Sequence, residues 1–171
     1  KVFAILDIET ITDARLAFSL HLLFCDSKGN ILDRYNALVS EIVNAPFGQE
    51  LISRDSFMKN KCFFYFNALS WDEIPVKSFE EIANDFAAIS AKYNARTVMC
   101  AYNAKFDYSV LQRNAKVYYD GTFFDDDVEL VDIMTMALAT ICDTNKFVRW
   151  CMVNGATTEK GNVKTNAETV Y

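Results

Sequence analysis

Two acids near the start of the chain follow an apolar run and could hold a metal ion. Asp7 and Glu9 stand two positions apart in Asp7-Ile8-Glu9-Thr10, directly after the apolar residues 2–6. Side chains alternate across a strand, so both carboxylates would leave the same face of a sheet. Carboxylates held side by side repel each other, and a divalent cation relieves that repulsion. Two solvated acids at a strand end would give the same pattern, so this segment alone does not decide between them.

A third acid follows a later strand. The pattern predicts a short strand at 97–101 and a helix from 104 to about 118, with Asn103 as the N-cap of the helix. Asp107 lies one turn inside this helix and points back toward the end of the sheet. A helix start beside the first strand would bring Asp107 to the first two acids. The structural alternative is an acid that stabilises the first turn through the helix dipole.

Both segments resemble motifs of the DEDD (DnaQ-like) 3′–5′ exonucleases, the family of the proofreading subunit of bacterial polymerases. Asp7-Ile8-Glu9-Thr10 is similar to the first motif of that family. Tyr102-Asn103-Ala104-Lys105-Phe106-Asp107 is similar to the second motif, in which N-x-x-x-F-D is typical. The elements expected between them, a hairpin, a helix and a strand, also match the family, so the resemblance covers most of the chain.

The resemblance implies removal of nucleotides from the 3′ end of nucleic acid, with single-stranded DNA as the preferred substrate. The acids that would act in catalysis and bind two Mg²⁺ or Mn²⁺ ions are Asp7, Glu9 and Asp107. The residues that would contact the substrate are Thr10, Asn103 and Phe106. An RNA-trimming exonuclease of the same family, or a non-catalytic domain that binds nucleic acid or a polymerase, are the alternatives.

Hydrophobic periodicity predicts the elements that must position these residues. Strands are expected at 2–6, 16–24, 31–39, 97–101 and 129–131, and helices at 79–93, 104–118, 132–141 and 145–153. The first strand is expected to be buried on both faces, and the segment 44–71 to form a short helix and irregular loop. We therefore expect one α/β domain over residues 1–171, with a ribonuclease H-like mixed five-stranded sheet, a leading antiparallel hairpin and helices on both faces.

The third motif of the family, a His or Tyr ahead of a final Asp, has no match in the chain. The only histidine is His21, and its offset from Asp26 would send the two side chains to opposite faces of a strand, so His21 is predicted to be an ordinary strand residue. Thr165 and Glu168 form a T-x-x-E pattern that predicts a helix from Asn166. The third motif is therefore expected beyond residue 171, with a C-terminal helix missing from the sequence.

Other features have a structural and a functional interpretation. The aromatic run Phe63–Phe66 could stack on bases, but a core or crevice-lining cluster is favoured. Asp132 is expected to cap a helix rather than to support the metals, and the acidic run at 125–127 to be solvated surface. The lysines that could touch phosphates, though a solvated position is favoured, are Lys59, Lys61 and Lys105.

Composition narrows the class of protein. A net charge of −6 does not favour a broad basic clamp on duplex DNA, but it suits a nuclease that recruits cations and holds a few terminal nucleotides. The five cysteines are scattered, which argues against a zinc ribbon or a disulfide framework and for free thiols. No run is long and apolar enough for a membrane span, and no signal peptide opens the chain, so a cytoplasmic location is expected.

Overall fold

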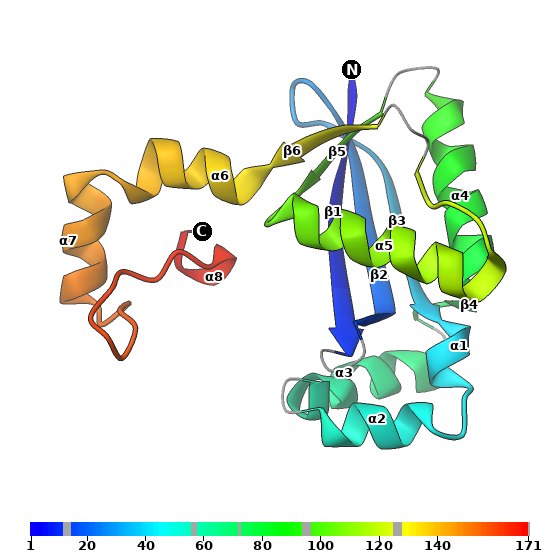
Figure 1. The fold of residues 1–171 in the computed structure, drawn as a ribbon. Coiled ribbons are helices and arrows are strands. Elements are labelled where there is room, and N and C mark those ends of the chain that lie inside the picture. Colours follow the sequence, from blue (N-terminus) through cyan, green and yellow to red (C-terminus); the bar gives the residue numbers. More distant parts are fainter. Residues whose placement is uncertain (12–14, 56–57, 72, 94–96, 125–127, 171) are drawn as a thin grey trace.

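The computed structural model describes residues 1–171 except 12–14, 56–57, 72, 94–96, 125–127 and 171 (Figure 1). The strands are β1 (Val2–Ile11), β2 (Leu16–Asp26), β3 (Ile31–Val39), β4 (Val76–Lys77), β5 (Thr97–Ala101) and β6 (Glu129–Asp132). The helices are α1 (Ser40–Val43), α2 (Gly48–Arg54), α3 (Met58–Ser70), α4 (Phe79–Lys92), α5 (Ala104–Tyr119), α6 (Ile133–Ala137), a π-helical turn (Leu138–Cys142), α7 (Asn145–Val153) and α8 (Ala167–Val170).

The strands form one mixed sheet in the order β4-β3-β2-β1-β5-β6. β1, β2 and β3 pair antiparallel, whereas β5 runs parallel to β1 and β6 runs parallel to β5. This confirms the predicted mixed sheet that opens with antiparallel strands. The sheet has six strands because β4 adds a parallel edge to β3. Two residues are too few to show an alternating pattern, so β4 could not be predicted from the sequence.

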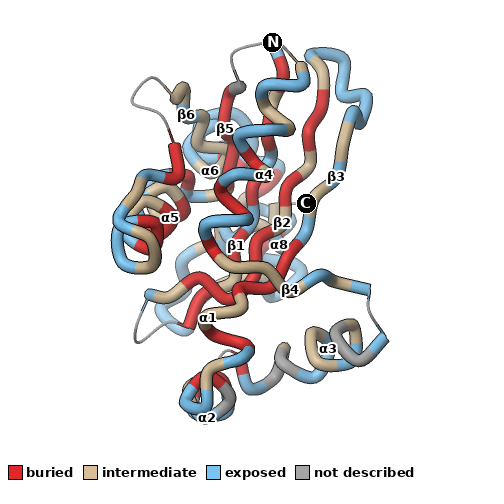
Figure 2. The backbone as a smooth tube through the Cα atoms, turned by 90° about the vertical axis from the view of Figure 1, so that its right-hand side faces the viewer, coloured by how far each residue is buried: buried red, intermediate tan, exposed pale blue. Residues whose placement is uncertain are grey.

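Burial in β1 differs from the expectation that both faces of the strand are covered. The even-numbered residues, such as Ala4 and Leu6, are buried, whereas Ile5 on the other face is 38% exposed. Figure 2, in which the backbone is coloured by burial, shows buried segments along the central strands. The even face packs against α4 and α5, and Phe24 of β2 contacts Phe86 of α4 with ring centroids 6.1 Å apart. A short, uninterrupted apolar run does not reveal which of its faces is covered, which explains the error.

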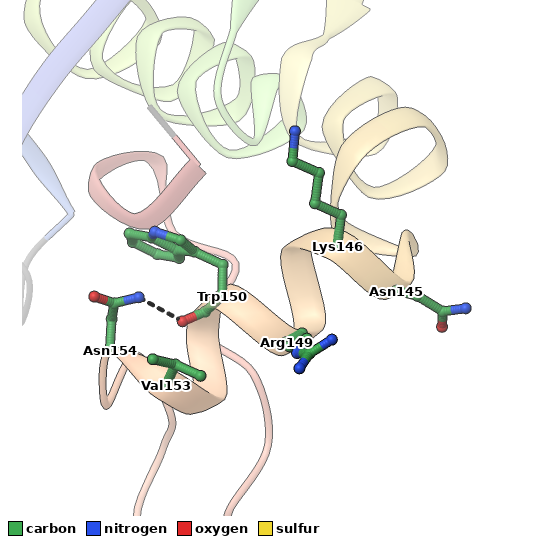
Figure 3. A pocket seen from close by; sticks show the side chains of 6 residues that line it. All are labelled: Asn145, Lys146, Arg149, Trp150, Val153 and Asn154. Carbon is green, nitrogen blue, oxygen red and sulfur yellow. Dashed lines mark hydrogen bonds between the residues drawn. The ribbon is translucent and has the colours of Figure 1, made fainter.

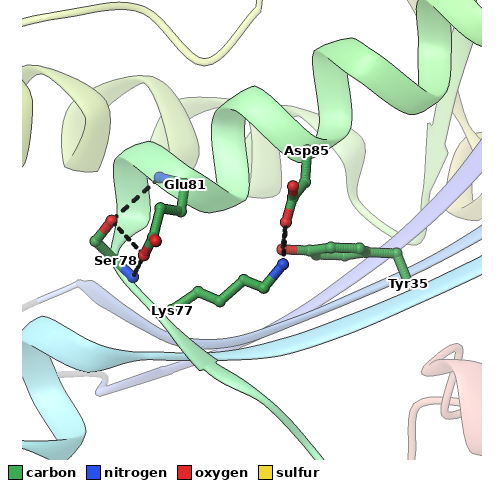
Figure 4. A network of polar contacts seen from close by, with 5 residues as sticks. All are labelled: Tyr35, Lys77, Ser78, Glu81 and Asp85. Atoms are coloured by element: carbon green, nitrogen blue, oxygen red, sulfur yellow. Dashed lines mark hydrogen bonds and ion pairs between the residues drawn. The ribbon is translucent and has the colours of Figure 1, made fainter.

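Local contacts fix the orientation of α4 beside the sheet. The Ser78 hydroxyl accepts the Glu81 amide at 3.2 Å and the Glu81 carboxylate accepts the Ser78 amide at 2.7 Å, which confirms the predicted capping box. In the middle of the helix, Asp85 accepts hydrogen bonds from Tyr35 at 2.9 Å and Lys77 at 2.5 Å (Figure 4). Since Tyr35 lies on β3 and Lys77 on β4, these bonds join α4 to the far edge of the sheet.

The segment 44–71 contains two helices, where a short helix and an irregular loop were expected. Gly48 opens α2 so close to α1 that a Cβ there would lie 1.7 Å from the carbonyl oxygen of Ile42, so only glycine fits. α3 starts because the buried Asp55 carboxylate accepts the Met58 amide at 2.9 Å and caps the helix. Met58 is fully buried, which anchors α3 to the core near the end of β1 (Figure 1).

The C-terminal elements extend from the β6 edge of the sheet (Figure 1). The helix expected at 132–141 is α6 followed by the π-helical turn, whereas α7 has the predicted bounds. Around them lies a second small core of Ala137, Cys142, Phe147 and Cys151. α8 begins after Asn166, whose carbonyl accepts the amides of Thr169 and Val170, so the expected helix start is confirmed to within one residue.

The described part of the chain bears on two expectations, which concern the cysteines and membrane-spanning helices. The four cysteines whose side chains are described are free and buried, as expected: they are Cys25, Cys100, Cys142 and Cys151. Within the described ranges, no helix is both long and apolar enough to cross a bilayer.

Candidate active site

The candidate site forms because β1 continues past the end of β5. β1 pairs with β5 only as far as Ile5, which lies opposite Cys100, but it pairs with β2 as far as Ile11. The chain leaves β5 at Ala101 and turns into α5 at Ala104. The end of β1 that carries Asp7 and Glu9 therefore has β2 on one side and the first turn of α5 on the other.

Asp7 and Glu9 lie on the same face of the sheet, as their spacing predicts. Asp7 is opposite His21 and Glu9 is opposite Ser19 in the antiparallel register with β2. Asp7 is exposed, whereas only 13% of the Glu9 side chain is exposed. Ile8 between them points into the core, so the backbone holds the two carboxylates together on the outer face.

Asp107 comes from the first turn of α5 and is 6% exposed. Burial raises the pKa of Asp107 most, the negative charges of Asp7 and Asp132 add to this effect, and together they bring the pKa to about 7. An acid is shifted by a neighbouring charge only when the two are close. The charge of Asp7 thus acts on Asp107, whereas the predicted gathering of all three acids stays a prediction.

Asn103 is the N-cap residue of α5, as predicted, but its side chain does not cap the helix. Its backbone is left-handed, with φ of 70°, and its side chain makes no capping hydrogen bond. An N-cap side chain reaches the helix amides from an extended backbone, so this conformation takes the amide group away from them. Asparagine tolerates the left-handed region better than most residues, which accounts for its presence at the turn.

Asp132 joins this turn to the start of α6. Its Oδ1 accepts the amides of Met134 at 2.9 Å and Thr135 at 3.3 Å, which confirms that Asp132 caps the helix. The same oxygen accepts the Asn103 amide at 3.2 Å. The charge of Asp132 also raises the pKa of Asp107. Asp132 therefore lies close to the candidate site in addition to capping α6.

His21 and its neighbours were not assigned to the site from the sequence. His21 is half-buried, faces Asp7 across the strands, and has Nε2 3.2 Å from the Ser19 hydroxyl oxygen. Ser19 in turn donates to the Tyr65 hydroxyl of α3 at 3.3 Å. Burial lowers the pKa of His21, against the opposing effect of the charges on Asp7 and Glu9. The pairing of β1 with β2 would have revealed this position, but the hairpin predicted from the sequence joins β2 to β3.

Among the ion pairs of the described residues, the one at the candidate site joins Lys61 of α3 to Glu9. The Nζ of Lys61 lies 2.6 Å from Oε1 of Glu9, and 41% of the lysine side chain is exposed. Burial favours the neutral amine, but the hydrogen bond to Glu9 and the charges of Glu9 and Asp7 raise the pKa of Lys61. The sequence favoured a solvated lysine. No local pattern could reveal this partner, because Lys61 and Glu9 are 52 residues apart.

The three predicted substrate-contacting residues are exposed to different degrees. Asn103 is exposed and Phe106 is partly buried against the main core. Thr10 is only 6% exposed and follows a β-bulge that lies between Glu9 and Thr10. Of the three, Asn103 is therefore the most accessible to a substrate. The substrate contacts of all three residues stay predictions. The acidic run at 125–127 lies outside the described residues.

The donor types at the site fit a hard divalent cation. Carboxylate oxygens are the ligands that Mg²⁺ and Mn²⁺ prefer, and a cation would offset the repulsion between Asp7 and Asp107. Among the described residues, however, no three His, Cys, Asp or Glu side chains are grouped closely enough to surround an ion. Glu9 is directed to Lys61 instead.

The aromatic run of α3 divides into two pairs. Tyr65 and Phe66 are partly buried against the main core, as the favoured structural interpretation predicts. Phe63 and Phe64 are 66% and 71% exposed, so that interpretation is wrong for them.

A separate hollow of about 480 Å³ lies on α7 (Figure 3), and its lining includes Lys146, Arg149 and Trp150 but none of the acids above.

Two solved structures are similar to the whole chain. One is Exonuclease I of E. coli in complex with a dT13 oligonucleotide, with a TM-score of 0.54 and 15% identity over 99% of this chain and 35% of that chain. The other is the same enzyme in complex with a dA16 oligonucleotide, with a TM-score of 0.57 and 14% identity over the same shares. No known protein family matches the sequence, and no curated protein does.

At this identity the likeness concerns the fold. It confirms the ribonuclease H-like α/β class expected from the sequence. The chain spans about a third of the length of the enzyme that it resembles.

Proposed function

We propose that the chain is a metal-dependent 3′–5′ exonuclease domain that acts on single-stranded DNA. The observation that carries this proposal is Asp107, an acid buried against the charge of Asp7 with its pKa raised to about 7. An ionised acid that is buried beside a like charge costs the fold stability, and such perturbed groups are concentrated at functional sites. The same acids complete both motifs of the exonuclease resemblance.

The solved neighbours support the substrate class. Exonuclease I of E. coli was solved with two oligonucleotides, one of thymidine and one of adenosine nucleotides. The two oligonucleotides carry different bases, and both are bound by the same enzyme. We extend this substrate class, single-stranded DNA, to the present chain.

The ions that the proposal requires are two Mg²⁺ or Mn²⁺, held by Asp7, Glu9 and Asp107. When bound, such ions supply an activated water nucleophile and stabilise the charge on the leaving oxygen. The chain itself contributes part of the arrangement: β1 holds Asp7 and Glu9 on one face, and the charge of Asp7 acts on Asp107 of α5. Lys61 stabilises the charge of Glu9 in the absence of an ion.

A second candidate is a domain that binds nucleic acid without cleaving it. The contact between Lys61 and Glu9 favours this candidate, because an ammonium group then neutralises the carboxylate that an ion would need. Such a domain would bind a single strand equally well with and without divalent cations. Cation dependence of strand shortening therefore separates the two candidates.

The test follows the length of a 5′-labelled single-stranded oligonucleotide with Mg²⁺, with Mn²⁺ and with a chelator. We expect shortening from the 3′ end with either cation and none with the chelator. Asp7→Asn and Asp107→Asn should each lower the rate at least about a hundredfold, because each removes a charged ligand. Asp143→Asn, an exposed acid outside the site, is the matched control.

Shortening that persists unchanged in Asp7→Asn would disprove the proposed site. A strand that is bound but stays intact with both cations would support the non-catalytic domain. An RNA strand of the same base order, assayed in parallel, decides between DNA and RNA as substrate.

A further inference from the structure

α3 presents three large aromatic side chains to solvent. Phe63 is 66% exposed, Phe64 is 71% exposed, and Trp71, just past the end of the helix, is 76% exposed. The opposite side of α3 already anchors the helix, because Met58 is fully buried and Tyr65 packs against Phe18 with ring centroids 5.2 Å apart. The exposed rings therefore add little to folding, and exposed apolar groups of this size mark binding surfaces.

We propose that this aromatic face, made of Phe63, Phe64 and Trp71, is a stacking platform for the unpaired bases of the strand whose 3′ end lies at Asp7 and Glu9. The inference rests on the proposed function and adds the surface that holds the strand. The flat faces of aromatic side chains stack on any base, which suits a strand held without regard to its sequence.

The rings are arranged along the helix. Phe64 and Trp71 are seven residues apart, which puts them two turns apart on the same side of an α-helix. Trp71 continues that geometry because its amide donates to the carbonyl of Asn67 at 3.2 Å. Phe63 meets Phe64 edge to face, with centroids 6.1 Å apart. Together they form a row long enough for more than one base.

The row begins next to the candidate site. Lys61 lies three residues before Phe64, so the two side chains are neighbours on the helix surface. The Nζ of Lys61 contacts Glu9 at 2.6 Å. A strand that leaves the acids past Lys61 therefore meets Phe64 first, after a single helical turn.

Charge favours nucleic acid over an apolar protein segment as the occupant. α3 carries Lys59 and Lys61 and no Asp or Glu, although the whole chain has a net charge of −6. Lys59 is exposed and Lys61 is partly exposed. Phosphates would thus approach a helix without acidic residues, whereas most of this protein would repel them.

The test measures binding of fluorescently labelled dT and dA oligonucleotides by anisotropy, with the full chain and a chelator so that no cleavage occurs. The double variant Phe63→Ala/Phe64→Ala should weaken binding of both oligonucleotides about tenfold or more, and Phe64→Tyr should retain it. Phe47→Ala removes a phenylalanine that is 55% exposed at the start of α2, outside the platform, and should leave binding unchanged. All variants are compared by circular dichroism and unfolding midpoint.

A second measurement uses the tryptophans, of which the chain has two. In Trp150→Phe the remaining reporter is Trp71, and its fluorescence should be quenched when an oligonucleotide stacks on it. Unchanged fluorescence at saturating oligonucleotide contradicts the proposal.

The remaining outcomes separate this inference from the proposed function. If the double variant binds both oligonucleotides as tightly as the wild type, the platform is wrong, while cleavage assays on the acids still decide the function. If the double variant instead converts a dimer to a monomer without loss of oligonucleotide affinity, the surface joins two copies of the chain and the proposal is overturned. Platform-dependent binding without any cleavage supports the platform and rejects the exonuclease.

Discussion

Burial of the Asp107 carboxyl group disfavours its ionised form. In the folded chain its pKa is raised from 3.8 to about 7, first by burial and then by the charge of Asp7. Between these two values the folded state binds a proton that the unfolded state has released. This group therefore contributes stability at low pH, and the contribution is lost as the pH rises from about 4 to about 7.

Replacing Asp107 with Asn should remove this loss of stability with rising pH. Without divalent cations, the free energy of unfolding of Asp107→Asn minus that of the wild type should increase with pH across this window. The slope for one proton has an upper limit of about 1.4 kcal/mol per pH unit, and the difference should level off above pH 7. Urea unfolding at several pH values measures it. A difference that does not change with pH would show that Asp107 titrates normally.

A residue of the candidate site could be predicted from the sequence only where a local pattern marks its position. Asp7 and Glu9 share a face because of a two-residue period, and Asp107 lies in the first turn of a helix, so local patterns predict the positions of all three candidates. His21 and Lys61 reach the acids only through the strand pairing and the position of α3. No local period encodes such contacts, which is why they were missed.

At the scale of elements, the turn before α5 depends on a contact from another strand. Asp132 Oδ1 accepts the amide of Asn103 as well as the amides that begin α6. The Ser78–Glu81 capping box was predictable because both partners lie within one turn. Asn103 occupies the predicted N-cap position, but its side chain does not cap the helix, and its amide donates to a residue 29 positions away.

Asp132 variants separate hydrogen bonding from charge at this junction. Asp132→Ala removes the acceptor for the α6 cap and should lower the free energy of unfolding by about 1–2 kcal/mol. Asp132→Asn keeps an acceptor oxygen and should lower it by less, while it also removes a charge that raises the pKa of Asp107. Denaturant unfolding compares the two variants. Equal losses in both would indicate that the charge, and not the cap, supports the junction.

At the scale of the whole molecule, burial is unevenly distributed. The main core extends from the even face of the sheet to α4 and α5, and includes Phe18, Phe24 and Leu111. The C-terminal elements have only their own small core around Phe147 and Cys151. They extend away from the sheet in Figure 1. The Tyr102 hydroxyl donates to the carbonyl of Thr165 and so joins the segment before α8 to the turn before α5. Sequence periodicity located α7 correctly but could not show that it packs outside the main core.

This distribution predicts two levels of stability. Regions with few buried apolar contacts open at lower free energy than the core, so amides of α7 should exchange with solvent deuterium roughly tenfold or more faster than those of α5. Tyr102→Phe removes the hydrogen bond to Thr165 and should accelerate exchange in α8 while α4 stays unchanged. Hydrogen exchange followed by mass spectrometry measures each helix separately. Equal protection of α5 and α7 would mean that both cores unfold as one unit. The segment before α8 would then be held at Tyr102 by the whole fold rather than by one hydrogen bond.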